Sequence, residues 1–203
     1  MKRAKVGLGL TLILMVLLLT SLGCQAFDPP YEFKGATVEP AVSVPDFELK
    51  STSGKPFHLS DVKGDITLIY FGYTTCPDVC PLTLAYLKQA LTGLPDRDRV
   101  HFIFISVDPK RDTPEVLGRY LATFDPTFIG LTDDFAKVEQ VMKPYGATAW
   151  REEAPDSTAG YFMAHTARVF LVGPDQKLQL FYPHGFQPDA LRSDLAYLLK
   201  NKL

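Results

Sequence analysis

Residues 66–81 read ITLIYFGYTTCPDVCP, and this stretch decides the fold. Its first six residues, Ile66 to Phe71, form a β-branched and aromatic run, which is typical of a strand buried on both faces. Beyond Pro81, leucines recur at three- and four-residue spacing, as on the buried face of a helix: Leu84, Leu87, Leu91 and Leu94. The stretch therefore predicts a buried strand, a loop with two cysteines, and a helix.

The alternation of strand and helix patterns continues along the chain. Further strands are expected at 47–49, 57–59, 100–107, 128–131, 169–172 and 178–181. One of the helices is expected to start at Asp112-Thr113-Pro114-Glu115, with Asp112 as its capping residue. This order predicts an α/β domain, with a central, mostly parallel sheet, an antiparallel edge and helices on both faces. That arrangement is the outline of a thioredoxin-like fold.

The composition is that of an ordinary globular protein. The chain has 203 residues, of which 46% are hydrophobic, and a formal net charge of −2. These values exclude a disordered chain and give no electrostatic reason to expect nucleic acid as a partner. The three cysteines are too few for a small domain held together by disulfides.

The N-terminus predicts export from the cytoplasm. Lys2 and Arg3 form a basic start before an uncharged apolar run, so residues 1–23 are expected to be a signal peptide or a membrane anchor. The run resembles a bacterial lipoprotein signal, with Cys24 as the lipidated residue. Residues 24–44 are predicted to be a tether and residues 45–203 the folded domain. Both anchors place the domain on the extracytoplasmic face of the cell membrane, where disulfides are permitted.

Cys76 and Cys80 lie in the loop between the buried strand and the helix, where α/β sheets gather function. Cys80 is expected near the helix N-terminus, where free N–H groups favour a thiolate. Thiolates serve both disulfide exchange and metal ligation. The close spacing also allows a reversible Cys76–Cys80 disulfide. Inert buried cysteines are the third alternative.

A metal site needs a third ligand, and His165 is the best candidate, because its segment faces the cysteine loop in a thioredoxin-like fold. Two thiolates and one imidazole suit Cu(I) and, with a further ligand, Cu(II). Asp78 and Asp108 are candidates for a supporting role around the ligands. The remaining histidines are expected to be structural or solvated: His58, His101 and His184.

Three segments together resemble the signature of the Sco/SenC family: Cys76 to Pro81, Ser106 to Pro114, and His165 ahead of a late strand. The resemblance covers roughly residues 44–199. It implies a membrane-tethered, thioredoxin-like domain that binds copper through Cys76, Cys80 and His165. It also implies a metallochaperone that helps assemble the dinuclear copper centre of cytochrome c oxidase subunit II, supplied by a copper donor and a thiol reductant.

The competing interpretation is a thiol-disulfide reductase that reduces the copper-ligand cysteines of the oxidase. Whether the protein is an enzyme stays open for that reason. A peroxiredoxin is disfavoured because Tyr73 stands where that family has Thr. Copper carriage is favoured over a dedicated reductase, because His165 adds a ligand that disulfide exchange does not require.

Overall fold

The computed structural model describes residues 30–201, and a compact unit begins at Phe33. Its strands are β1 (Ala36–Ser43), β2 (Glu48–Ser51), β3 (Pro56–His58), β4 (Ile66–Gly72), β5 (Val100–Ser106), β6 (Ile129–Thr132), β7 (Ala149–Ala154), β8 (Gly160–His165), β9 (Arg168–Val172) and β10 (Lys177–Pro183). Its helices are α2 (Val79–Leu91), α3 (Pro114–Ala122), α4 (Phe135–Met142) and α5 (Pro188–Asn201). Three short 3₁₀ turns accompany them: η1 (Leu59–Val62), η2 (Arg97–Arg99) and η3 (Lys143–Tyr145).

The main sheet has the strand order β1-β10-β9-β4-β5-β6-β2-β3. The central β4–β5 and β5–β6 pairs are parallel, because helices α2 and α3 provide the crossovers. Every other pairing in this sheet is antiparallel. The predicted α/β fold is confirmed, but the sheet is mixed rather than mostly parallel, since tight turns join β2 to β3 and β9 to β10.

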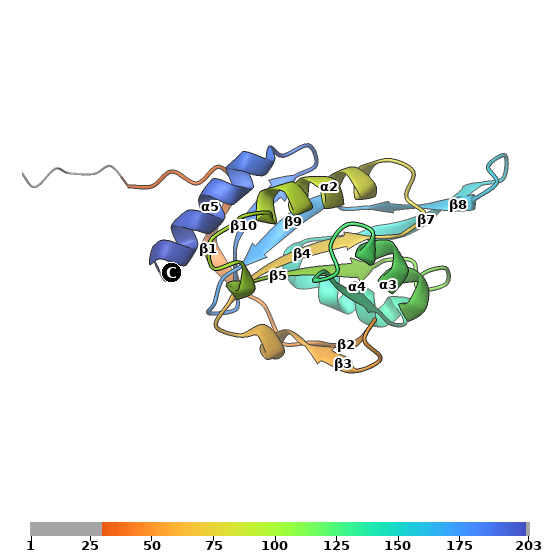
Figure 1. Cartoon of the computed structure of the whole chain (residues 1–203). Helices are drawn as coiled ribbons and strands as arrows, with labels where there is room; N and C mark the ends of the chain where they lie inside the picture. Colours follow the sequence, from red (N-terminus) through yellow and green to blue (C-terminus); the bar gives the residue numbers. More distant parts are fainter. Residues whose placement is uncertain (1–29, 202–203) are drawn as a thin grey trace, which may run out of the picture. The chain divides into compact units, whose positions relative to one another are not determined.

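Helices cover both faces of the sheet, as predicted. On one face, Tyr70 contacts Cys80 of α2, and the neighbouring Phe104 contacts Tyr120 of α3. Helix α5 joins this face and packs beside α2 (Figure 1). On the other face, Phe71 packs against Tyr145, which follows α4. The strand between these layers is buried throughout, which explains the continuous apolar run of residues 66–71.

Strand β1 corrects the predicted tether over residues 24–44. Residues 36–43 pair antiparallel with β10 and form an edge of the main sheet. Just before the strand, the backbone N–H groups of Lys34 and Gly35 donate to the buried carboxylate of Asp194. No strand pattern marks this segment in the sequence, because nearly all of the β1 side chains are exposed and the hydrophobic alternation is missing. Pro40 is tolerated because β1 is an edge strand.

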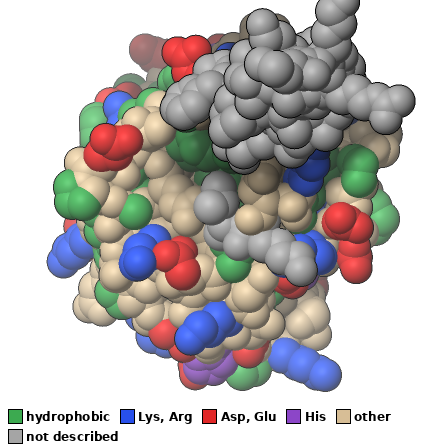
Figure 2. Space-filling view, turned by 90° about the vertical axis from the view of Figure 1, so that its left-hand side faces the viewer, with side chains coloured by type: hydrophobic (Ala, Val, Ile, Leu, Met, Phe, Trp, Pro, Cys, Tyr) green, Lys and Arg blue, Asp and Glu red, His purple; other side chains and the backbone are tan. Residues whose placement is uncertain are grey.

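The predicted signal or anchor segment, residues 1–23, and the predicted lipidation site Cys24 lie outside the described residues. Among residues 30–201, no helix is long and apolar enough to cross a bilayer. On the face shown in Figure 2, basic and acidic side chains of the described residues are interspersed, in keeping with the net charge of −2.

Strands β7 and β8 form a separate two-stranded sheet that the sequence did not predict. The side chains of β7 are mostly exposed, so its sequence also lacks a hydrophobic period. Figure 1 shows this hairpin extending beyond the main sheet. His165 is the last residue of β8, so a strand end, rather than a loop, presents its side chain.

Candidate metal centre

The cysteine loop begins where β4 ends at Gly72. A Cβ at this glycine would lie 2.7 Å from the Tyr70 ring and 2.9 Å from the Phe104 ring, so only glycine fits. Helix α2 starts at Val79, with Asp78 at its N-cap position. Cys76 therefore lies just before the helix, and Cys80 lies inside its first turn. The buried strand and the helix together fix both cysteines near the end of β4.

The structure brings the three predicted ligands together. The candidate ligand atoms of Cys76, Cys80 and His165 all lie within 4.8 Å of one another. Cys80 Sγ is 3.5 Å from His165 Nε2, and the backbone N–H of Cys80 donates to Cys76 Sγ at 3.4 Å. Neither of these two cysteines is in a disulfide. Two soft sulfurs and one imidazole at these separations can share a single ion.

Two tyrosines hold the imidazole of His165. Its ring centroid lies 5.9 Å from that of Tyr70 and 5.8 Å from that of Tyr73, with interplanar angles of 89° in both cases. Tyr70 Oη also donates to Cys80 Sγ at 3.7 Å. His165 Nδ1 is buried and has no hydrogen-bond partner in the described part of the chain. The other ring nitrogen, Nε2, is the one that faces Cys80 Sγ, so Nε2 is the candidate ligand atom.

The two cysteines differ in their acidity. A hydrogen bond from the Cys80 thiol, aided by His165 and by the N–H groups of Asp78 and Cys80, lowers the pKa of Cys76 to about 3 against the opposing effect of burial. Burial raises the pKa of Cys80. The expectation that Cys80 is the thiolate is therefore wrong, because the N–H groups at the helix start point at the sulfur of Cys76.

Asp112 supports the cysteine loop through hydrogen bonds, a role that the sequence did not reveal. Its fully buried carboxylate accepts hydrogen bonds from Thr74 N (3.0 Å), Thr74 Oγ1 (2.6 Å) and Ser106 Oγ (2.6 Å). Burial raises the pKa of this carboxyl group. Asp112 was expected to cap α3, but Thr113 does so by accepting from Val116 N. Because the sequence pattern indicated that Asp112 caps a helix, its hydrogen bonds with Thr74 were not expected.

The two predicted supporting aspartates lie differently around the centre. Asp78 is exposed, and its backbone N–H, rather than its carboxylate, contacts Cys76. Asp108 is buried, forms an ion pair with Arg111 and accepts a hydrogen bond from Tyr161 Oη at 2.9 Å. Its carboxylate therefore engages neighbours of the site rather than the sulfurs or the imidazole.

The other histidines lie away from the centre, as predicted. His58 is 3.4 Å from Glu48, and His101 is 3.0 Å from Asp65. His184 is exposed.

Comparisons with known proteins point to one family. The SCO1/SenC family model matches residues 35–200. The SCO2-like protein of Rickettsia felis is 36% identical over 140 residues, which cover 68% of each chain. The copper-bound structure of Bradyrhizobium japonicum ScoI is 37% identical, with a TM-score of 0.69 over 80% of this chain and 100% of that chain.

A third match is BsSco, a member of the Sco family of cytochrome c oxidase assembly proteins, in which a disulfide switch has been identified. It is 25% identical, with a TM-score of 0.63 over 80% of this chain and 94% of that chain. The family model covers most of the compact unit, and these structures share its thioredoxin-like architecture. The chain belongs to the SCO1/SenC family.

Proposed function

We propose that this protein binds one copper ion through Cys76, Cys80 and His165 and carries it during cytochrome c oxidase assembly. The convergence of the three ligand atoms within 4.8 Å carries the proposal. The copper-bound ScoI relative and the assembly role of the Sco family support it. The recipient in this proposal is the dinuclear copper centre of oxidase subunit II. A copper donor and a thiol reductant complete the set of partners.

The donor set is suited to Cu(I), and a further ligand would extend it to Cu(II). Because the pKa of Cys76 is lowered to about 3, we expect its sulfur to bind the metal as a thiolate with no proton to release. The Cys80 thiol, in contrast, must release its proton as its sulfur joins the metal. The tyrosines around His165 shield the centre, and both cysteines are buried, although 9% of Cys76 is exposed and none of Cys80. A recipient would approach from the side of Cys76.

A thiol-disulfide reductase is the second candidate, favoured by the pKa of Cys76 of about 3. In this reaction, the Cys76 thiolate attacks a disulfide of the oxidase and forms a mixed disulfide, which releases one partner thiolate. Cys80 then loses its proton to that thiolate and attacks Cys76 Sγ, which breaks the mixed disulfide and releases the second partner thiolate. The partner disulfide gains two electrons, and a Cys76–Cys80 disulfide remains. His165 has no necessary part in these steps.

Histidine substitution separates the two functions. His165→Ala is expected to weaken copper binding far more than disulfide reduction, because it removes a ligand but neither sulfur, and the Cys80 thiol still lowers the pKa of Cys76. His184→Ala, which changes an exposed histidine, is the matched control. Copper per chain and X-ray absorption of the bound metal are the measurements. Cys76→Ser or Cys80→Ser is expected to abolish tight binding, since a hydroxyl does not replace a soft sulfur. Unchanged copper affinity in the His165 variant would refute the proposed ligand set.

Oxidation is a second test of the same site. A disulfide between Cys76 and Cys80 leaves no thiolate to bind metal, so peroxide-treated protein is expected to take up no copper. Treatment with a mild dithiol is expected to restore uptake. Copper binding by the fully oxidised chain at the level of the reduced chain would contradict the proposal.

We further propose attachment to the extracytoplasmic face of the cell membrane through the N-terminus. The basic and apolar start of the sequence supports a signal peptide or an anchor in residues 1–23. Cys24→Ala distinguishes the two. A lipoprotein is expected to accumulate as unprocessed precursor, whereas a spanning anchor is expected to change mass only by the substitution.

A further inference from the structure

The hairpin that carries His165 has no strand partner in the described main sheet, so side chains such as the buried Met163 attach it to the domain. Strands β7 and β8 pair only with each other among the described strands. An isolated two-stranded hairpin has marginal stability in water. The groups that attach this hairpin to the main domain therefore control where the imidazole lies relative to the two sulfurs, which are fixed by β4 and α2.

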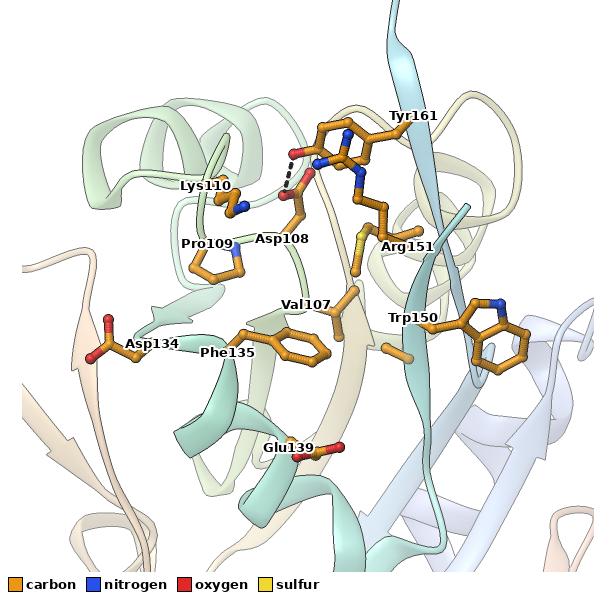
Figure 3. A pocket seen from close by; sticks show the side chains of 12 residues that line it. Val107, Asp108, Pro109, Lys110, Asp134, Phe135, Glu139, Trp150, Arg151 and Tyr161 are labelled. Carbon is orange, nitrogen blue, oxygen red and sulfur yellow. Dashed lines mark hydrogen bonds between the residues drawn. The ribbon is translucent and has the colours of Figure 1, made fainter. Parts of the chain in front are cut away.

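Arg111 and Asp108, from the segment between β5 and α3, provide such an attachment. Arg111 Nη1 donates to the carbonyl oxygens of Ala159 (3.3 Å) and Tyr161 (3.1 Å), and its Nε donates to the Asp108 carboxylate. Its guanidinium lies 3.7 Å from the centroid of the Tyr161 ring. Tyr161 Oη in turn donates to Asp108, as Figure 3 shows. One partly buried ion pair thus holds both the backbone and a side chain of the hairpin.

A second cation lies over the Tyr161 ring. Arg151 of β7 lies 4.0 Å from its centroid, and Figure 3 shows this side chain reaching the ring along one side of a cavity of about 660 Å³. Two guanidinium groups over one aromatic ring favour a fixed ring orientation. The hydroxyl of Tyr161 is fixed at the same time by Asp108. The hairpin is therefore immobilised at residue 161, four positions before the imidazole on the same strand.

A second set of contacts links Arg111 to the imidazole of His165. The guanidinium lies 5.7 Å from the centroid of the Tyr73 ring, within the range of a cation–π contact. Tyr73 belongs to the cysteine loop and meets the His165 ring edge-on. Arg111 thus contacts both the cysteine loop, at Tyr73, and the hairpin, at Tyr161.

We propose that Arg111 and Asp108 are positioning residues that hold His165 against the two cysteine sulfurs by clamping hairpin β7–β8 to the domain. The proposal rests on the proposed role of His165 as a copper ligand. Loosening the clamp withdraws the imidazole but leaves both sulfurs in place. Cu(II), which favours nitrogen ligands, then loses more affinity than Cu(I), which the two thiolates alone can hold.

Arg111→Lys in the full chain, solubilised in detergent, is the principal test. Lysine keeps the charge beside Asp108, but it lacks the planar fork that stacks on the rings and reaches both carbonyls. Cu(II) affinity is expected to fall about tenfold, the lower end of the range for residues that orient metal ligands. Cu(I) affinity, measured by competition with a chromophoric chelator, is expected to change less than about threefold. Arg119→Lys, at an exposed position on α3, is the matched control.

Two further measurements exclude a general loss of structure. In the metal-free protein, hydrogen exchange of the β8 amides is expected to accelerate in the Arg111 variant, while exchange in α2 stays unchanged. In a His165→Ala background, Arg111→Lys is expected to cause no further loss of Cu(II) affinity, because its effect passes through the imidazole. Tyr161→Phe, which removes only the hydroxyl bound to Asp108, is a second variant with the same expected direction should Arg111→Lys fold poorly.

Unchanged exchange in β8, or additive losses in the double variant, would overturn the clamp. Equal losses for Cu(I) and Cu(II) would do so as well. If His165→Ala weakens Cu(II) binding and Arg111→Lys does not, only the clamp fails. If His165→Ala itself has no effect on copper, the proposed ligand set fails, and faster exchange of β8 still decides whether Arg111 holds the hairpin.

Discussion

Replacement of Asp112 by alanine tests the support beneath the cysteine loop. The substitution removes three hydrogen bonds to a fully buried carboxylate, two from Thr74 and one from Ser106. A hydrogen bond to a charged group contributes about 1.5–3 kcal/mol to the free energy of unfolding. Two effects reduce this loss of stability. The variant does not bury a carboxylate, and water can reach the half-buried Thr74. We expect a net loss of about 3 kcal/mol.

Urea unfolding followed by circular dichroism measures this loss directly. For a chain of this size, about 3 kcal/mol corresponds to a fall of about 6–12 °C in Tm. Asp112→Asn, which keeps one acceptor oxygen, is expected to lose less than Asp112→Ala. Asp156→Ala is the matched control, because that aspartate is exposed in the turn between β7 and β8. Copper affinity is expected to fall with Asp112→Ala even where the chain is folded, since Thr74 lies two residues before Cys76.

A loss below about 0.5 kcal/mol, the range of an ordinary surface substitution, would refute this reasoning. It would mean that the contacts with Thr74 and Ser106 contribute nothing beyond the cost of burying the carboxylate. Intact copper affinity together with a large loss of stability would separate the two roles, and would show that the loop keeps its shape without Asp112.

Three further predictions concern the thiols and the N-terminal edge. In the reduced chain carrying Cys24→Ser, the thiolate absorbance near 240 nm is expected to show one ionised sulfur, Cys76, from pH 5 upward; a single step near pH 8.5 for both thiols would contradict this. Because the pKa of Cys76 is lowered on folding, the Cys76 thiolate contributes fully to stability above the unfolded pKa near 8.5, and this contribution is lost as the pH falls toward 3. Denaturant midpoints at pH 4 and 7 measure the contribution, with Cys76→Ser as the control. A fragment that starts at Phe33 is expected to be more stable than one that starts at Val44 by about 2–4 kcal/mol, because the shorter one lacks β1 and two N–H donors to Asp194; equal denaturant midpoints would count against it.

Much of the site follows from local sequence. The strand before Cys76 and the helix after it are visible as patterns, because the strand is buried on both faces and the helix on one. The four-residue step between the cysteines fixes their separation once the helix begins. His165 required more than local pattern. A single histidine has no spacing relation to residues some 85 positions earlier, so its assignment depended on the thioredoxin-like topology and on the family resemblance.

Strands β1 and β7 show what hydrophobic patterns do not reveal. Their side chains are largely exposed, so no alternation of apolar and polar residues marks them. Each exists because a partner strand, β10 or β8, satisfies its backbone hydrogen bonds. The predicted tether was too long for the same reason.

The sequence by itself determined the α/β order, the cysteine loop and the set of candidate ligands, since these depend on periodicity and on short spacings. Only the tertiary structure decided which cysteine is the thiolate, because the pKa depends on burial and on N–H groups that the folded chain aims at Cys76. It also decided the roles of Asp112 and Arg111, whose partners lie 38 and 50 residues away in the chain. Contacts across such distances arise from the packing of the sheet and hairpin, which no local pattern encodes.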